Sequence, residues 1–158
     1  MGYEIMIKKY LLKAKALKPE LKKTTVTAGG ISAALAQGEK TVVDFGTHLV
    51  GYLSLKLSYE GSIPDAPALL RVKFCEIESE IFEDTSDYNG WISKSWIQEE
   101  YIHVDDIPSV LKLVRRYAFR YVLIEAVSVS SKYKLVVDGA SVTAVTSAKA
   151  DVIPEGRD

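Results

Sequence analysis

Strict alternation of apolar and polar residues is the feature that most constrains the fold of this chain. Between residues 53 and 59, three leucines and a tyrosine alternate with serine and lysine, and residues 70–74 repeat the pattern. Because successive side chains of a strand point to opposite faces, each run predicts a strand with one face in a core and the other in solvent. Residues 95–104 alternate less cleanly, since neither set there is purely apolar.

Further strands are predicted from β-branched and aromatic runs at 121–127 and 133–137, and from weak alternation at 141–146. Turn residues separate these runs. They occur at Gly29–Gly30, Gly38, Glu60–Asp65, Asp87–Gly90, Asp105–Pro108 and Asp138–Gly139. Many short strands with such frequent turns favour an all-β fold, an antiparallel β-sandwich of jelly-roll type. A length of 158 residues suits one domain with a single core.

A different period governs residues 1–23. Apolar side chains recur there along one side of a helix at Tyr3, Ile7, Tyr10, Leu11 and Ala14. The spacing predicts a short amphipathic helical arm that Pro19 ends. Seven lysines and two glutamates give the arm a charge of +5, and since the whole chain carries −1, about −6 remains elsewhere. Such an arm can steer an acidic partner, although a solvated helix face explains the lysines more simply.

Composition argues against several classes of partner. The 20 basic and 21 acidic residues are almost balanced, which gives no support to nucleic-acid or anionic-membrane binding. Arginines interleaved with aromatics at 115–121 could grip a single strand of nucleic acid, but a strand with one aromatic face explains them better. The lone Cys75 permits no internal disulfide and no zinc motif. With no secretion signal and no apolar span of about 20 residues, the protein is predicted to be cytoplasmic.

Three segments, taken together, resemble a known family. Residues 44–52 read Asp-Phe-Gly-Thr-His-Leu-Val-Gly-Tyr, residues 71–76 read Arg-Val-Lys-Phe-Cys-Glu, and residues 119–125 read Phe-Arg-Tyr-Val-Leu-Ile-Glu. In this order they resemble the β-sandwich domain that precedes the catalytic barrel in bacterial α-L-rhamnosidases. The resemblance covers roughly residues 38–147. It implies that the catalytic carboxylates belong to a helical barrel that this chain does not contain.

No catalytic residue is predicted within the chain itself. Glycoside hydrolysis needs two carboxyl groups facing each other, about 5 Å or about 6.5–9.5 Å apart. Six acidic residues cluster at 76–87, but an acidic, solvated loop explains them better. His48 and His103 have no serine or cysteine partner at a telling spacing. The oxygen-rich loop at 84–90 lacks the EF-hand pattern, so neither a metal nor a cofactor is expected.

A candidate carbohydrate site follows from Trp91, Asp87 and Asn89. An aromatic face can stack on the apolar side of a sugar ring while nearby polar groups bind its hydroxyls. The alternative is that both tryptophans pack in the core or against another domain. Packing is favoured for Trp96, which alternates in register with the apolar residues of the strand predicted after it.

The predicted organisation is therefore a helical arm at 1–23, a β-sandwich at 24–148, and a linker at 149–158 to a missing C-terminal catalytic domain. The predicted function is that of a non-catalytic N-terminal accessory domain of a larger α-L-rhamnosidase-like glycoside hydrolase. It would brace the catalytic barrel and contribute to the binding of rhamnose-containing carbohydrate. A self-sufficient carbohydrate-binding module and a purely structural interaction domain remain as alternatives.

Overall fold

The computed structural model describes residues 22–146. Within this range Thr24–Ala144 form one compact unit. The helix predicted for the arm lies outside the described residues, except that Lys22 and Lys23 begin the first strand. The linker predicted at 149–158 also lies outside them.

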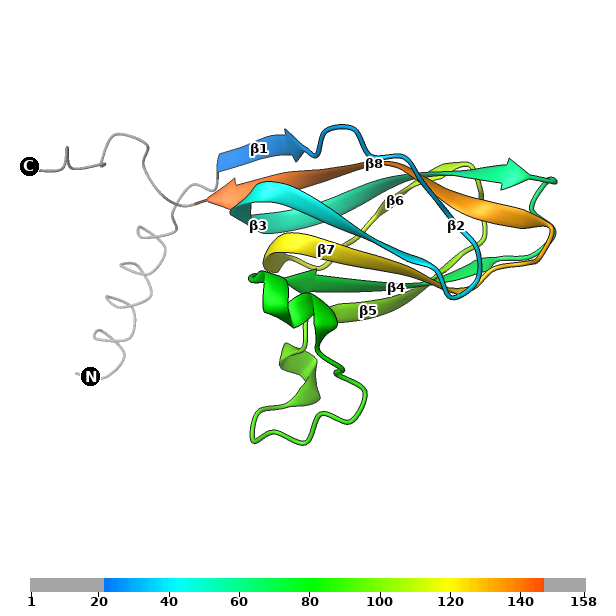
Figure 1. Cartoon of the computed structure of the whole chain (residues 1–158). Coiled ribbons are helices and arrows are strands. Elements are labelled where there is room, and N and C mark those ends of the chain that lie inside the picture. Colours follow the sequence, from blue (N-terminus) through cyan, green and yellow to red (C-terminus); the bar gives the residue numbers. More distant parts are fainter. Residues whose placement is uncertain (1–21, 147–158) are drawn as a thin grey trace, which may run out of the picture. The chain divides into compact units, whose positions relative to one another are not determined.

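Eight strands account for most of the described chain. They are β1 (Lys22–Thr27), β2 (Ala33–Leu35), β3 (Lys40–Gly61), β4 (Ala68–Cys75), β5 (Glu99–Val104), β6 (Ser109–Lys112), β7 (Tyr117–Ser128) and β8 (Tyr133–Thr146). Two short 3₁₀ helices, η1 (Glu78–Phe82) and η2 (Lys94–Trp96), lie between β4 and β5. The strand order is β1-β8-β3-β7-β4-β5, with β2 also paired to β8 and β6 to β3 (Figure 1). Every pair with a defined register is antiparallel, which confirms the all-β antiparallel class.

The 22-residue strand β3 holds the sheet together because it changes partners along its length. Its first part pairs with β7, from Lys40 to Gly51, and its second part pairs with β8 and, more briefly, with β6. The register shifts between Asp44 and Leu49, where Gly46 has a φ of 76° that residues with a side chain rarely adopt. The ladder runs through β3 without a break, so hydrogen bonding does not delimit two separate sheets. The jelly-roll-like sandwich therefore stays a prediction.

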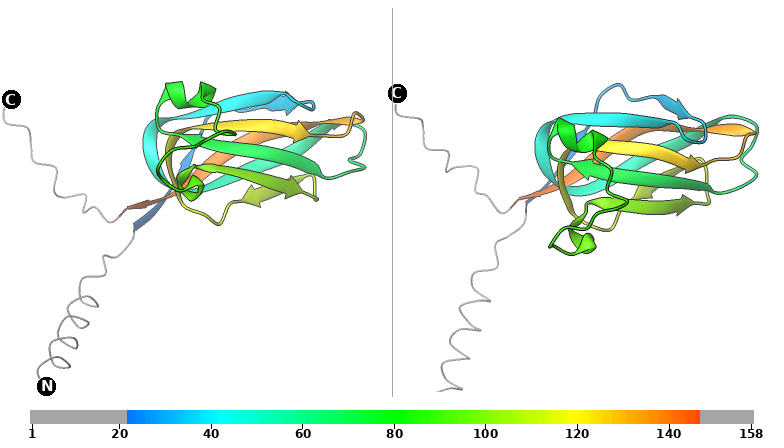
Figure 2. Two further views of the ribbon diagram at one scale, coloured as in Figure 1. Left: turned by 90° about the horizontal axis from the view of Figure 1, so that it is seen from below. Right: turned by 60° about the horizontal axis from the view of Figure 1, so that its bottom comes forward.

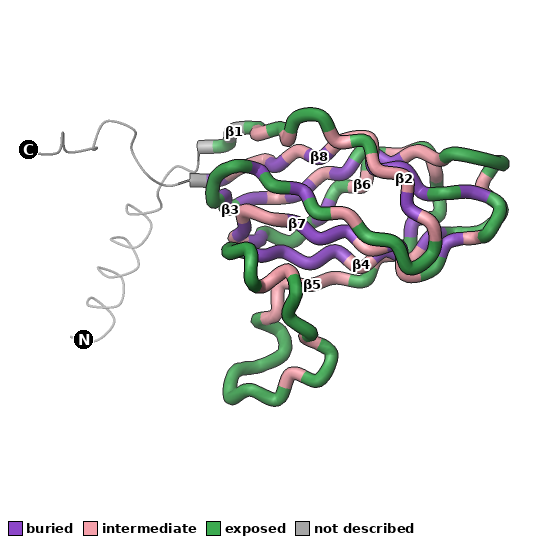
Figure 3. Tube along the Cα trace, viewed as in Figure 1, coloured by how far each residue is buried: buried purple, intermediate pink, exposed green. Residues whose placement is uncertain are grey.

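The core confirms the alternation read from the sequence. Leu53, Leu55 and Leu57 are 0%, 0% and 1% exposed. They join one buried cluster with side chains from β2, β4, β7 and β8, so the curled sheet encloses a common core (Figure 3). An aromatic group lies within it. Phe74 stacks on Tyr117 with ring centroids 3.9 Å apart and meets Phe119 edge-on at 5.0 Å.

The prediction that β4 turns Lys73 towards solvent is wrong, because Lys73 is only 4% exposed. Its ammonium group donates hydrogen bonds to the backbone carbonyls of Glu80 and Glu83, the latter at 2.7 Å. Helix η1 therefore covers this face of β4, and the buried charge is satisfied by carbonyl oxygens. Cover by a helix that follows the strand leaves no mark on the alternation of the strand itself.

Two further predictions need correction. The strand predicted from residue 95 begins only at Glu99, because residues 94–96 form η2. The turn predicted at Asp138–Gly139 is instead a bulge inside β8. Gly139 pairs with Lys56 and Val137 with Leu57, which leaves Asp138 without a partner on β3.

Candidate functional site

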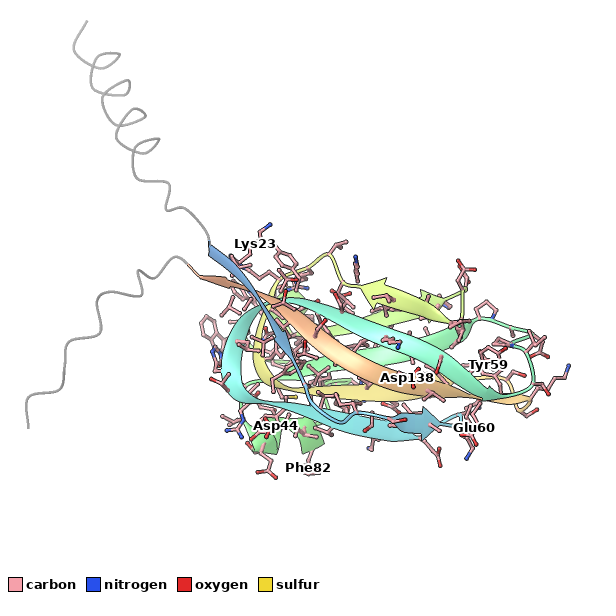
Figure 4. The ribbon with its side chains drawn as sticks, turned by 90° about the horizontal axis from the view of Figure 1, so that it is seen from above. Lys23, Asp44, Tyr59, Glu60, Phe82 and Asp138 are labelled. Atoms are coloured by element: carbon pink, nitrogen blue, oxygen red, sulfur yellow. The ribbon has the colours of Figure 1, made fainter. Side chains whose placement is uncertain are left out.

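The first and last motif segments meet across β3 and β7. The carboxylate of Asp44 accepts two hydrogen bonds from Arg120, Nε to Oδ1 at 2.9 Å and Nη2 to Oδ2 at 3.0 Å. Oδ1 also accepts the backbone N–H of Gly46 at 2.7 Å, which closes the turn at the irregular part of β3. These bonds, first from Arg120 and then from Gly46, hold the pKa of Asp44 below its usual value of 3.8. Figure 4 labels Asp44 on the rim of the sheet.

We expect the Asp44 carboxyl to titrate with a midpoint below 3.8 and Arg120→Gln to raise that midpoint. Because its pKa is lowered in the folded state, the pair stabilises the fold above the unfolded pKa of about 3.9 and loses this effect as pH falls through the folded pKa. Carboxyl chemical shifts recorded from pH 6 to pH 2 measure the midpoint. Arg116→Gln serves as the matched control, and an equal response in both variants would contradict the assignment.

The middle motif segment supplies the centre of a second charged cluster. Arg71 donates to Glu99 (Nε to Oε1, 3.0 Å) and to Glu125 (Nη1 to Oε2, 2.8 Å). Thr85 donates its hydroxyl to Glu99 as well, at 2.6 Å. Burial alone would raise the pKa of Glu99, but the hydrogen bonds from Arg71 and Thr85 outweigh it and the pKa is lowered. The guanidinium of Arg71 thus bridges two carboxylates and links β4, β5 and β7, and the lowered pKa of Glu99 makes that residue a poor general acid.

Between β4 and β5 the chain leaves the sheet, and we call residues 76–98 the aromatic excursion (Figure 1). The right view of Figure 2 also shows part of it projecting beyond the strands, and Figure 3 shows it mostly exposed. Five of the eleven large apolar side chains that are exposed in the described chain lie here: Ile77, Phe82, Trp91, Ile92 and Trp96. The excursion therefore concentrates apolar surface that the fold itself leaves in water.

The residues predicted to bind carbohydrate all lie on this excursion. Trp91 is 97% exposed, and Asp87 and Asn89 are exposed as well. No hydrogen bond among residues 22–146 joins their side chains to each other or to the sheet. The assignment of a carbohydrate site to these three residues stays a prediction.

Of the two kinds of packing predicted for Trp96, packing in the core is wrong, and packing against another domain stays a prediction. Trp96 is 73% exposed and does not pack in the core of the described domain. Its side chain borders a hollow of about 350 Å³, which we call the Trp96 depression. The other lining residues are Val50, Glu76, Gln98 and residues 115–118.

Hydrogen bonds hold the walls of the Trp96 depression in place. Arg115 donates from Nη2 to the carbonyl of Ser95 at 2.8 Å, and its guanidinium lies 4.9 Å from the centre of the Tyr117 ring. Gln98 accepts the backbone N–H of Ala118 through Oε1 at 2.9 Å. The hydroxyl of Tyr117 donates to Glu100. Burial first, and then this bond to Glu100, raises the pKa of Tyr117, so the phenol stays neutral.

Other kinds of site find no support in the part of the chain that is described. Between residues 22 and 146 no three side chains of histidine, cysteine, aspartate or glutamate gather in a way that could hold a metal ion. Cys75 is buried, and burial raises the pKa of its thiol to about 11, so it is a poor nucleophile at neutral pH. No helix in this range is long and apolar enough to cross a membrane.

Comparison with known proteins decides the family. Residues 9–144 match the N-terminal domain of glycosyl hydrolase family 78 alpha-rhamnosidases. The chain belongs to this family. The resemblance read from the three motif segments is thereby confirmed.

A solved structure supports the same assignment. The chain is similar to a rhamnosidase from Klebsiella oxytoca with rhamnose bound, at 35% sequence identity and a TM-score of 0.81. The match covers 88% of this chain and 32% of that chain, so this family 78 N-terminal domain spans about a third of that rhamnosidase. No curated protein sequence matches the chain.

Sequence reasoning recognised the segments of this family 78 domain but missed what they form together. Val50, Glu76 and residues 115–118 all belong to, or directly adjoin, the motif segments, and the fold brings them to one hollow. The signal that could have found them was the clustering of polar and aromatic types within those segments. Trp96 could not be found in this way, because its alternation with residues 102 and 104 predicted a strand face.

Proposed function

We propose that this chain is a non-catalytic accessory domain of a larger α-L-rhamnosidase-like glycoside hydrolase, built as a β-sandwich that braces the catalytic domain. The observation that carries the proposal is the exposed apolar surface of the aromatic excursion. The family match and the one-third coverage of a rhamnosidase support it. Activity, substrate and catalytic residues would then belong to another part of the parent enzyme.

The exposed side chains suit a protein interface. Isolated apolar residues on a surface are ordinary, whereas Phe82 at 82%, Trp91 at 97% and Ile77 at 58% exposure lie within fifteen positions of one another. Tryptophan and arginine are the residues that most often anchor such interfaces. Figure 4 labels Phe82 at the edge of the molecule, pointing away from the sheet.

The first part of the excursion, from Glu76 to Thr85, is also fixed to a rigid base. Lys73 ties η1 to β4 from below through the carbonyls of Glu80 and Glu83, and Glu80 in turn accepts the backbone N–H of Glu76 at 2.6 Å. Thr85 is bonded to Glu99 on β5. A surface held in this way loses little conformational freedom when a partner covers it. The bracing role thus has both an apolar contact surface and a support for it.

The test uses a parent rhamnosidase that contains this domain and the same parent carrying Phe82→Ser and Trp91→Ser together. We expect calorimetry of the unchanged parent to give coupled unfolding of the two domains. The double variant should separate this into two transitions, because the apolar contact between the domains is weakened. In the isolated 158-residue chain the same double variant should leave the unfolding midpoint almost unchanged, since both side chains are exposed there.

Ile63→Ser with Val110→Ser is the matched control, because these residues are 79% and 56% exposed but lie outside the excursion. It should leave the coupled transition of the parent intact. The bracing role is wrong if the excursion variant behaves like this control. Hydrolysis of aryl α-L-rhamnosides by the purified 158-residue chain, lost on mutating one of its own carboxylates, would overturn the non-catalytic assignment.

A further inference from the structure

We propose that the Trp96 depression is a saccharide subsite, and that it takes a single terminal 6-deoxyhexose such as L-rhamnose. The choice of a deoxy sugar rests on the proposed function, whereas the site itself rests on its geometry. It is distinct from the loop of Trp91, Asp87 and Asn89 to which sequence reasoning pointed.

The backbone that carries the aromatic wall of this hollow is held by hydrogen bonds. The backbone N–H of Trp96 donates to the carbonyl of Ser93 at 3.0 Å, and the next residue back, Ser95, is bonded to Arg115 on the far wall. The indole nevertheless remains 73% exposed. An open indole on a backbone held in place suits stacking against the C–H side of a pyranose. Trp91 has no such support among the described residues.

The hollow also contains polar side-chain groups whose hydrogen-bonding capacity is not filled by the fold. The side-chain carbonyl oxygen of Gln98 accepts from the backbone N–H of Ala118. The amide N–H groups of Gln98 can therefore donate to a ligand. The carboxylate of Glu76 is about half exposed, with Oε2 3.8 Å from His48 Nε2, and can accept from hydroxyls. Arg116 is exposed and forms no ion pair with any residue of 22–146. Sugar hydroxyls both donate and accept, and these three groups offer both roles.

A second hollow shows why this one is preferred. A depression of about 410 Å³ beside Phe82 is also lined by an aromatic and by charged residues, Arg71 among them. There the guanidinium of Arg71 is already bonded to Glu99 and Glu125. A ligand would have to displace those hydrogen bonds. Breaking them costs more free energy than the new contacts with the ligand would contribute.

Size and floor agree with one small sugar. About 350 Å³ is near the lower end of the range for ligand sites, which is roughly 300–1,000 Å³. The floor is the buried ring of Tyr117, held by its stack on Phe74. Val50 adds an apolar wall at 36% exposure, which suits the methyl group of a 6-deoxyhexose better than a hydroxymethyl group. A shallow site with few ligand atoms predicts a Kd in the millimolar range.

The test is a titration of the isotope-labelled 158-residue chain with L-rhamnose, followed by amide and indole NMR shifts. We expect saturable shifts at the Trp96 indole and at the amides of Gln98 and Ala118. Trp96→Ala should weaken binding at least tenfold, and Arg116→Gln should weaken it while leaving the unfolding midpoint unchanged. Trp91→Ala is the matched control and should bind as the unchanged chain does.

Three results would overturn the proposal in different ways. The absence of NMR shifts throughout the chain, at an L-rhamnose concentration about 100-fold above a millimolar Kd, would rule out the subsite. Shifts confined to Trp91, Asp87 and Asn89 would move it to the loop predicted from sequence. Equal binding of L-mannose, which differs from L-rhamnose only by a hydroxyl on C6, would overturn the choice of a deoxy sugar. Each outcome is independent of the bracing role, because that role is read from domain coupling in Phe82 and Trp91 variants without any sugar.

Discussion

Leu55→Asp is expected to abolish cooperative folding, with a loss of about 4 kcal/mol or more in the free energy of unfolding. Leu55 is 0% exposed and lies between Leu111 on β6 and Ala140 on β8. Both neighbours are apolar, so a carboxylate at this position would be buried without a partner. Urea denaturation followed by circular dichroism measures the effect.

Ser54→Asp is the matched control, because residue 54 faces away from the core and pairs with Lys112 and Ser141. Its midpoint should shift little, and the nearby lysine can offset the new charge. If both substitutions lowered the midpoint equally, the register of β3 would be wrong.

Gly51→Ala is expected to destabilise the domain by about 3 kcal/mol, the upper end of what overpacking usually costs. Gly51 is the residue at which β3 passes from its pairing with β7 to its pairing with β8, opposite Tyr117 and Ala144 respectively. A Cβ atom there would lie 2.3 Å from the carbonyl oxygen of Thr143 and 2.9 Å from the Cα of Ala144. Because both contacts are backbone atoms, the strands themselves would have to move apart.

Gly29→Ala gives a control for the loss of glycine itself. A Cβ at Gly29 would meet no atom within 4 Å, and its φ is not positive. Its thermal midpoint should therefore stay the same or rise slightly, since alanine restricts the unfolded chain. A similar loss in both variants would mean that the close approach of β8 to Gly51 does not matter for stability.

The strongest elements were predictable because their signal is local. The period of two in a strand arises from the backbone of that strand alone, so Leu53, Leu55 and Leu57 could be placed in the core without knowledge of their neighbours. Strands β2 and β6 were missed for the converse reason. They have three and four residues, too few to show a period, and they exist because they pair with β8 and β3.

The candidate site was predictable only in part. The motif segments indicated the family. Asp44 and Arg120, however, are 76 positions apart, and no local sequence pattern predicts that they form a bidentate pair. The same holds for the Trp96 depression, whose walls come from β3, β7 and the aromatic excursion. Convergence of distant segments depends on how the sheet curls, which no local pattern records.

By itself, the sequence determined the all-β class, the inward face of β3 and the membership in the family 78 N-terminal domains, because these depend on local period and on short motifs. Only the tertiary structure decided that Lys73 is buried, that Asp138 forms a bulge rather than a turn, and that Trp96 stays in water. All three depend on a neighbouring element: pairing with β3 places the bulge at Asp138, and cover decides the exposure of Lys73 and Trp96. Whether a side chain is covered depends on the element packed against it, and here that element comes from elsewhere in the chain or is absent from the domain.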